Sequence, residues 1–189
     1  MQQPSTLAAV GPFSDAKREA VYRAIHTRRD LLSQFLLDPV VLNRLLLVPH
    51  HSPSVGLTRP WNFLVVTDPN VKSRVKVASA NDEAAALFQD DQKRLYSAVK
   101  LEGIAEAPVN LSIACDRDRG RPVVLGRTHN RDIDLYSTVC AVQNPWLAAQ
   151  AEEIGVGWGS IFNDADLRGI LRFPDNVVPV AHLCLGHVA

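Results

Sequence analysis

Residues 132–162 read DIDLYSTVCAVQNPWLAAQAEEIGVGWGSIF, in which a run of helix-forming residues is followed by a glycine-rich run. The first part predicts a long helix from about Asp132 to Ile154. Pro145 lies inside this range, where a proline removes one backbone donor and costs about 3 kcal/mol unless a kink accommodates it. The second part, from Val156 to Phe162, predicts a strand. The segment thus predicts a long helix followed by a glycine-rich strand.

Three glycines stand at alternate positions in or beside this strand, at Gly155, Gly157 and Gly159, and Ser160 follows them. Glycine strips a strand of side chains, so that another backbone or a ligand can approach it closely. Ser160 would then face that ligand. The same residues also fit a β-bulge in which Ser160 bonds to the main chain. The pattern alone leaves both interpretations open.

The sequence on either side predicts further helices and strands in an irregular order. Asp38-Pro39 and Asp68-Pro69 have the form of a helix cap followed by a first-turn proline. Long helices around a few strands, without regular alternation, indicate an α+β fold. We expect a flexible leader at residues 1–13 and a single domain at residues 14–189. Three further helices are predicted: one capped by Ser14 or Asp15, one from Asp82 to Gly103, and one capped by Asn163 or Asp164. Further strands are predicted at residues 63–67, 109–115 and 178–188.

The charges of the chain balance. Lys and Arg together number 20, and Asp and Glu together also number 20. A neutral chain has no overall field that would draw it onto nucleic acid or an anionic membrane. No apolar stretch approaches the roughly 20 residues needed to cross a bilayer, and the first residues lack the pattern of a secretory signal. We therefore expect a cytoplasmic protein without nucleic-acid or membrane partners.

Cysteine and histidine give no metal signature. Cys115, Cys140 and Cys184 lie far apart in apolar runs and form no Cys-x-x-Cys pair, which favours buried free thiols. His50 and His51 are adjacent, so that on a regular strand their side chains would point to opposite sides. No acidic residue at ligand spacing accompanies them. We predict no metal site.

The segment from Asp116 to Arg131 is rich in Arg, Asp and Gly, which predicts an exposed loop. Its arginines would suit a nucleic-acid patch only together with aromatic residues and a net positive domain. Neighbouring aspartates offset the arginines. We therefore expect a solvated loop.

Arg28, Arg29 and Asp30 follow the first predicted helix and form the first candidate site. Two guanidinium groups can grip a phosphate with forked, charge-assisted hydrogen bonds, and the adjacent carboxyl group can carry a proton. The alternative is structural, because arginines near a helix C-terminus complement the helix dipole and Asp30 can pair with them at the surface. The triplet alone favours this structural alternative.

Residues 52–56, SPSVG, and residues 60–62, PWN, form a second candidate site. A hydroxyl at Ser54, small residues, exposed backbone amides and a rigid aromatic corner could receive a flat polar ring. The alternative is a well-packed turn in which Trp61 belongs to the core.

Over nearly the whole chain, and in the same order, these segments resemble the nitroreductase superfamily and its 5,6-dimethylbenzimidazole synthase branch, the flavin-consuming enzymes of cobalamin synthesis. Agreement at many separate places is more specific than any single short pattern. Ordinary nitroreductases commonly have Ser after the paired arginines, whereas this branch has Asp, as this chain does at Asp30. The resemblance is carried by residues 28–30, 53–56, 60–63, 100–104, 107–108, 115–117, 124–128, 134–144 and 155–162.

The resemblance implies a nitroreductase-like fold, with a central, mostly antiparallel sheet flanked by long helices, in an intertwined homodimer. It implies FMN at the dimer interface, with arginines on the phosphate and the glycine-rich strand near the ring. Leu32 takes a position at which the branch has a basic residue. The positions thereby assigned to flavin binding are Arg28, Arg29, Leu32, Ser54, Lys100, Gly157, Trp158 and Gly159.

For the reaction, the resemblance implies that reduced FMN is a substrate, which is fragmented with dioxygen to 5,6-dimethylbenzimidazole. Asp30 would act as general acid or base, and Ser160 would orient the reacting group by hydrogen bonding. A helical lid, with Lys100 nearby, would exclude water, and a separate reductase could supply the reduced flavin. Two alternatives stay open: an FMN-dependent NAD(P)H oxidoreductase that retains its flavin, and a flavin-binding protein without turnover.

Overall fold

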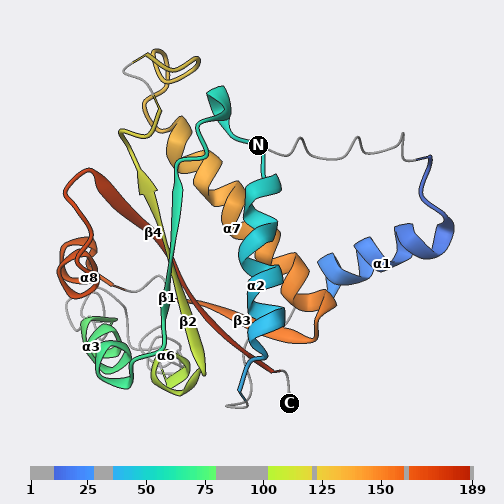
Figure 1. Ribbon diagram of the computed structural model, residues 1–189, viewed down its shortest axis with the longest axis horizontal. Helices are drawn as coiled ribbons and strands as arrows, with labels where there is room; N and C mark the ends of the chain where they lie inside the picture. The colour runs from blue at the N-terminus through green and yellow to red at the C-terminus, as the bar shows by residue number, and fades with distance from the viewer. Residues whose placement is uncertain (1–10, 28–35, 80–101, 121–122, 160–161, 188–189) are drawn as a thin grey trace, which may run out of the picture.

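A four-stranded antiparallel sheet forms the centre of the molecule (Figure 1). The computed structural model describes residues 11–27, 36–79, 102–120, 123–159 and 162–187. The order of the strands is β1-β2-β4-β3, and every neighbouring pair is antiparallel. The predicted α+β fold with an antiparallel sheet is confirmed. The strands are β1 (Trp61–Val66), β2 (Val109–Asp116), β3 (Ile154–Gly159) and β4 (Val177–His187).

The central strand β2 is buried on both sides because helices cover both faces of the sheet. All of its residues from Val109 to Cys115 are buried, and Leu111 and Ile113 have no exposed surface. One face is apolar, and the other also carries the buried polar residues Asn110 and Ser112. The register with β4 shifts between Ile113 and Ala114, whose partner is Pro179. Proline has no N–H for a regular ladder, which suits it to this irregular position.

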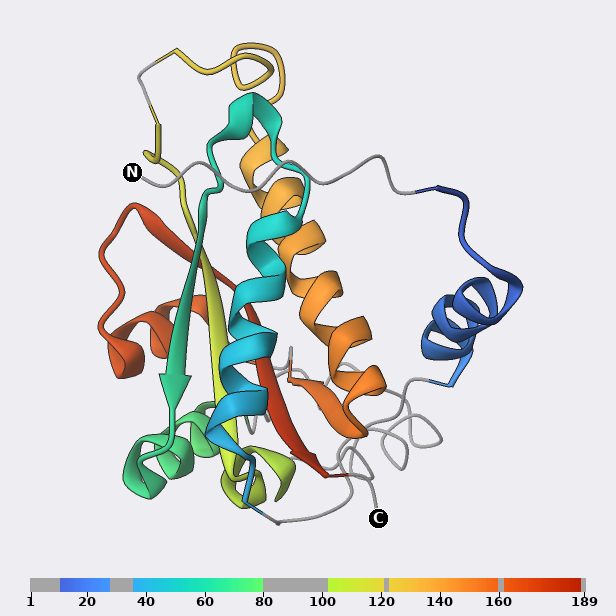
Figure 2. The ribbon, with the colours of Figure 1, turned by 45° about the vertical axis from the view of Figure 1, so that its right-hand side comes forward.

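Two helices, α2 (Pro39–Leu47) and α7 (Ile133–Ala151), cross one face of the sheet side by side (Figure 2). Asp38 caps α2 as predicted, because its carboxylate accepts a hydrogen bond from the Val40 amide at 2.8 Å. These helices and the sheet enclose the larger core, which includes Leu45, Leu111, Ile113, Val142, Ile154, Val156, Leu183 and Leu185.

The other face carries α3 (Pro69–Ser79), α6 (Glu102–Glu106) and α8 (Asp164–Leu171). The predicted caps are confirmed, since Asp68 accepts from the Asn70 amide at 2.7 Å and Asn163 accepts from the Ala165 amide at 2.8 Å. A second, smaller core lies beneath these helices. It is formed by Val66, Val75, Ile104, Ala107, Leu167, Leu171 and Cys184.

His182 in β4 is fully buried on this second face, and burial lowers its pKa from 6.5 to about 4. The unfolded chain therefore binds a proton near pH 6.5 that the folded chain does not bind until about pH 4. The stability contributed by neutral His182 is present above pH 6.5 and is lost as the pH falls towards 4, by about 3 kcal/mol in total. We expect urea unfolding to show this loss, and His182→Gln to flatten it. If the free energy of unfolding falls as much between pH 7 and pH 4.5 in the variant as in the wild type, the loss does not come from His182.

Helix α7 ends earlier than predicted. The predicted end near Ile154 was wrong, because Glu153 has a left-handed conformation with φ of 58° that terminates the helix, and Ile154 already starts β3. Pro145 lies buried within the helix, which continues across it to Ala151. The adjoining strand β3 begins two residues before its predicted start at Val156.

Helix α1 (Asp15–His26) stands away from the sheet (Figures 1 and 2). None of its residues is buried, although its apolar residues include Val21, Tyr22 and Ile25. Ser14 takes the cap position, as predicted, but its side chain makes no cap hydrogen bond. Beyond its C-terminal end, a hydrogen bond links the chain to α7, because the Gln150 amide donates to Thr27 Oγ1 at 3.3 Å.

The helix predicted from Asp82 to Gly103 lies almost entirely outside the described residues. Within the described ranges, no helix is both long enough and apolar enough to cross a membrane.

Candidate functional site

Some of the predicted site residues lie in the part of the chain that the structure describes. Ser54 lies in the loop before β1, and Gly157, Trp158 and Gly159 form the end of β3. The remaining predicted residues lie outside the described ranges; they are Arg28, Arg29, Asp30, Leu32, Lys100 and Ser160.

The loop that contains Ser54 has an unusual backbone. Gly56, Leu57 and Arg59 all have positive φ, at 61°, 53° and 46°. The Ser54 hydroxyl oxygen accepts a hydrogen bond from the Arg59 amide at 3.2 Å. A hydroxyl that accepts one hydrogen bond can still donate its own proton to a further acceptor. Ser54 therefore holds the turn and has a donor to offer a ligand.

This loop is locked against the chain at residues 124–126. A Cβ atom at Gly56 would lie 2.5 Å from Cγ1 of Val124, and a Cβ atom at Gly126 would lie 2.6 Å from Cγ1 of Val55. Both glycines also have positive φ, at 61° and 91°. Each loop thus uses a glycine to receive a valine of the other, which fixes the backbone around Ser54.

Arg119 anchors the start of β1 beneath the same loop. Its guanidinium donates to the carbonyl oxygens of Arg59 at 3.1 Å and Trp61 at 2.9 Å, and to Oδ1 of Asn62. Trp61 itself is buried, with 2% of its surface exposed. The structural alternative for Trp61 therefore holds, because its ring belongs to the interior and only its backbone shapes the loop.

Arg127 and Asp134 form a buried ion pair. The guanidinium binds both carboxylate oxygens, Nε to Oδ2 at 2.8 Å and Nη2 to Oδ1 at 3.1 Å, and Asp134 is only 1% exposed. This bonding raises the pKa of Arg127 above its ordinary value. The pair borders a cavity of about 310 Å³ lined by Arg117, Val124, Arg127, Thr128, Arg131 and Asp134.

The prediction of a solvated loop from Asp116 to Arg131 was therefore wrong for two of its arginines. Arg119 and Arg127 bind backbone carbonyls and a buried carboxylate, which a surface loop would leave to water. The signal in the sequence was Asp134, a charged residue within the otherwise apolar start of α7. A carboxylate there requires a cation when it is buried.

The glycines of β3 are not explained by their described neighbours. A Cβ atom at Gly157 would meet only Cys184 Cβ, at 4.0 Å, and one at Gly159 would lie 3.5 Å from the His182 carbonyl oxygen. These are ordinary contact distances, and neither glycine has a positive φ. The ladder between β3 and β4 runs without a register shift from Ile154 to Gly159, so these residues form no β-bulge. The arrangement fits a strand that something else approaches closely.

Trp158 points to the opposite face of β3 from these glycines. Its ring packs on Trp146 of α7, with the ring centres 5.8 Å apart. A ligand beside the glycines would therefore meet only the backbone of Trp158. The indole of Trp158 stabilises the strand from the opposite face of the sheet.

One chain does not bring Ser54 next to the glycines of β3. The loop of Ser54 contacts the start of α7, where the Val55 amide donates to Ser137 Oγ at 3.2 Å, whereas Trp158 packs on Trp146. These two points are about 14 Å apart along the helix at 1.5 Å per residue. The strands β1 and β3 also form opposite edges of the described sheet.

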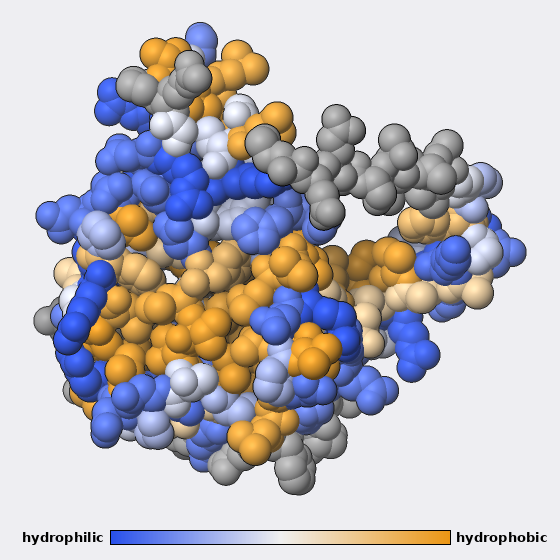
Figure 3. Space-filling view, viewed as in Figure 1, coloured by the Kyte–Doolittle hydropathy of each residue, from blue (hydrophilic) through white to orange (hydrophobic). Residues whose placement is uncertain are grey.

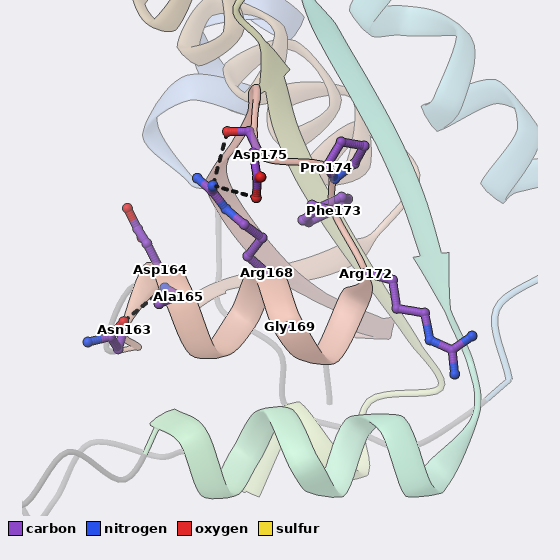
Figure 4. Close-up of a pocket in the computed structure, with 9 residues that line it drawn as sticks. All are labelled: Asn163, Asp164, Ala165, Arg168, Gly169, Arg172, Phe173, Pro174 and Asp175. Carbon is purple, nitrogen blue, oxygen red and sulfur yellow. Dashed lines mark hydrogen bonds and ion pairs between the residues drawn. The ribbon is translucent and has the colours of Figure 1, made fainter.

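A second and larger recess lies beside α8 (Figure 4). It has a volume of about 790 Å³ and is bounded by α8 and the turn that follows it. Arg168 lies along it and donates to the Asp175 carbonyl oxygen at 3.0 Å. Of the predicted site residues that the structure describes, none lines this recess.

The cysteines differ in burial. Cys115 and Cys184 are buried, as predicted, and burial raises the pKa of Cys184 to about 12. The prediction was wrong for Cys140, which lies on the exposed side of α7. Among the described residues, no three His, Cys, Asp or Glu side chains are grouped to hold a metal ion.

Comparison with known proteins assigns the chain to a family. The model of the nitroreductase family matches residues 23–187. The 5,6-dimethylbenzimidazole synthase of Rhodospirillum rubrum is 33% identical over 182 residues, which cover 93% of this chain and 86% of that protein.

Solved structures share the fold. A nitroreductase family protein from Clostridium novyi NT aligns over 89% of this chain and 85% of its own, with a TM-score of 0.71 and 23% identity. Iodotyrosine deiodinase, solved with FMN and 3-iodo-L-tyrosine, aligns over 89% and 90%, with a TM-score of 0.75 and 16% identity. The chain therefore belongs to the nitroreductase family and is an enzyme of the oxidoreductase type.

Proposed function

We propose that this enzyme is a 5,6-dimethylbenzimidazole synthase that consumes reduced FMN and dioxygen. The observation that carries the proposal is the similarity to the Rhodospirillum rubrum synthase, which extends over nearly the whole of both chains. Asp30 agrees with it, because the resemblance expects an acid after the paired arginines in this branch.

The glycines of β3 and the loop of Ser54 suit an FMN site. A planar ring can lie against a strand whose Gly157 and Gly159 present only backbone. The Ser54 hydroxyl can donate to a carbonyl or ribityl oxygen. Arg28 and Arg29 would hold the phosphate, the part of FMN that a pair of guanidiniums recognises best.

The residues of the chain would divide the chemical work. Bound reduced FMN would supply the electrons for dioxygen and the carbon atoms of the product. Asp30 would give and take protons as general acid or base. Ser160 would orient the reacting group through a hydrogen bond, and the flavin packed against β3 would exclude water from that side.

Gly157→Ala tests the placement of the flavin. The new methyl group meets only an ordinary contact with Cys184 Cβ, so the variant should fold as the wild type does. It should weaken FMN binding at least tenfold, about 1.4 kcal/mol, because it stands between the ring and the strand. A fluorescence titration measures the dissociation constant. Gly169→Ala, which has nothing within 4 Å of the new Cβ atom, is the matched control. Equal affinity in both variants would place the flavin elsewhere.

We further infer that the site is completed by a second copy of the chain. Ser54 and the glycines of β3 are too far apart in one chain for a single flavin ring to touch both. Helix α1 also leaves Val21, Tyr22 and Ile25 exposed, which a partner would bury.

Apolar residues also gather on the face shown in Figure 3, which carries α2 and the sheet. Exposed side chains in these elements include Val40 (59%), Leu47 (64%) and Val65 (38%). Sedimentation equilibrium should give twice the chain mass of 20.8 kDa. A single-chain mass at micromolar concentration would contradict the shared site.

The synthase reaction itself is tested with purified protein, chemically reduced FMN and air. Mass spectrometry should detect 5,6-dimethylbenzimidazole. Intact oxidised FMN as the only product would overturn the synthase proposal. Consumption of NAD(P)H with a nitro compound or quinone in that case would identify the retained-flavin oxidoreductase, and tight binding without any turnover would identify a flavin-binding protein.

A further inference from the structure

A row of polar side chains lies buried on the sheet face that α3, α6 and α8 cover. Asn110 and Ser112 of β2 and His182 of β4 each have no exposed surface. Ser112 is the direct partner of His182 in the ladder, and Asn110 is the partner of Cys184. Side chains directly opposite one another in a sheet share a face, so these groups lie together.

The hydrogen bonds of Asn110 determine which nitrogen of His182 carries the proton. The Asn110 amide nitrogen donates to the Ile104 carbonyl oxygen at 2.7 Å, and a carbonyl can only accept. The same amide nitrogen lies 3.1 Å from His182 Nε2, so Nε2 must accept its second proton. A neutral imidazole that accepts at Nε2 carries its hydrogen at Nδ1.

Three polar atoms of this row have no hydrogen-bond partner among the residues that the structure describes. They are His182 Nδ1, Ser112 Oγ and Asn110 Oδ1, and all are buried. A buried polar atom without a partner costs about 1–3 kcal/mol. In native proteins such atoms are commonly satisfied by an internal water molecule, which needs 2–4 polar partners.

We propose that Ser112 and His182 bind a water molecule in the interior, on the sheet face that α3, α6 and α8 cover. The water accepts a hydrogen bond from Nδ1–H of His182 and bonds to Ser112 Oγ, whereas Asn110 lies at the Nε2 side of the ring and sets the tautomer. Both neighbours of His182 across the sheet, Ser112 and Gly159, are small, so neither strand places a bulky side chain beside the ring. The water would connect β2 to β4 at the level of the glycines of β3.

The proposal uses only residues inside the sheet, and Gly159, against which the flavin is proposed to lie, is the ladder neighbour of His182. It predicts a fully buried, neutral histidine in the Nδ1–H form, whose proton is bound by an internal water molecule. The hydrogen bond between His182 and the water would also fix the position of the His182 carbonyl oxygen, which lies 3.5 Å from the Cβ position of Gly159.

Nuclear magnetic resonance of the full-length protein with ¹⁵N-labelled histidine tests the proposal at neutral pH. We expect His182 Nδ1 to have the shift of a protonated nitrogen, and its proton to show a cross-peak to water. An Nε2–H tautomer would overturn the proposal. So would an Nδ1 proton without any water cross-peak. This measurement needs no variant.

Ser112→Ala then tests the second ligand. The variant should keep the Nδ1–H tautomer, because Asn110 sets it, but should weaken or lose the water cross-peak. Ser79→Ala is the matched control, since Ser79 is also buried but already donates to the Val75 carbonyl oxygen at 2.8 Å. A cross-peak of wild-type strength in Ser112→Ala would exclude Ser112 from the site.

Discussion

Asp30→Asn is expected to reduce 5,6-dimethylbenzimidazole formation by about 100-fold or more, the contribution typical of a general acid or base. Asparagine keeps the size and a hydrogen-bonding group of aspartate but cannot carry a proton between reacting atoms. Binding of FMN should change little, because the proposed phosphate ligands are Arg28 and Arg29. Mass spectrometry of the product and a fluorescence titration of FMN measure the two quantities separately.

The control for this experiment is Asp15→Asn, which removes a carboxylate that is exposed on α1. It should form the product at the wild-type rate. If Asp30→Asn forms the product as fast as the control does, Asp30 is not the proton carrier. If Asp30→Asn loses FMN binding as well, the role of Asp30 is structural, which is the alternative in which it pairs with Arg28 and Arg29 at the surface.

Asp134→Asn is expected to destabilise the fold by about 3 kcal/mol, since breaking a buried ion pair typically costs 3–5 kcal/mol. The carboxylate is 1% exposed and accepts two hydrogen bonds from Arg127, whose side chain is 16% exposed. An amide leaves the guanidinium without the charge that it binds. For a chain of this length the loss corresponds to a decrease in Tm of roughly 10 °C.

A neighbouring ion pair supplies the matched control. Asp132 binds Arg117 at 3.3 Å, but its side chain is 59% exposed. Exposed pairs contribute about 0–1 kcal/mol, so Asp132→Asn should leave Tm nearly unchanged. Equal effects of the two substitutions in differential scanning calorimetry would mean that burial does not decide the strength of the Arg127 pair.

The local signals of the sequence predicted most of the described elements. Asp38, Asp68 and Asn163 cap helices as expected, because a side-chain acceptor next to a first turn acts within a few residues. The segment from Val109 to Cys115, predicted as a buried strand, is the central strand β2, and all of its residues are buried.

Contacts between distant segments were not predictable in the same way. Arg119 binds the carbonyl of Trp61, which lies far along the chain, and nothing in the local pattern of the loop distinguishes it from its solvated neighbours. The exposure of Cys140 depends on which side of α7 faces the sheet. The sequence does not indicate that side, because polar residues such as Asp134 and Thr138 lie on the buried side of the helix. The separation of Ser54 from β3 follows from the strand order, which the sequence pattern does not contain.

Gly56 and Gly126 limit which substitutions the two loops can accept during evolution. Each receives a valine from the opposite loop at less than 3 Å from its missing Cβ position. A side chain at either position could be accepted only together with a smaller residue than Val55 or Val124 on the other loop. The two loops should therefore change together among descendants of this chain, and a lone substitution in one of them marks a protein in which the turn around Ser54 has taken another shape.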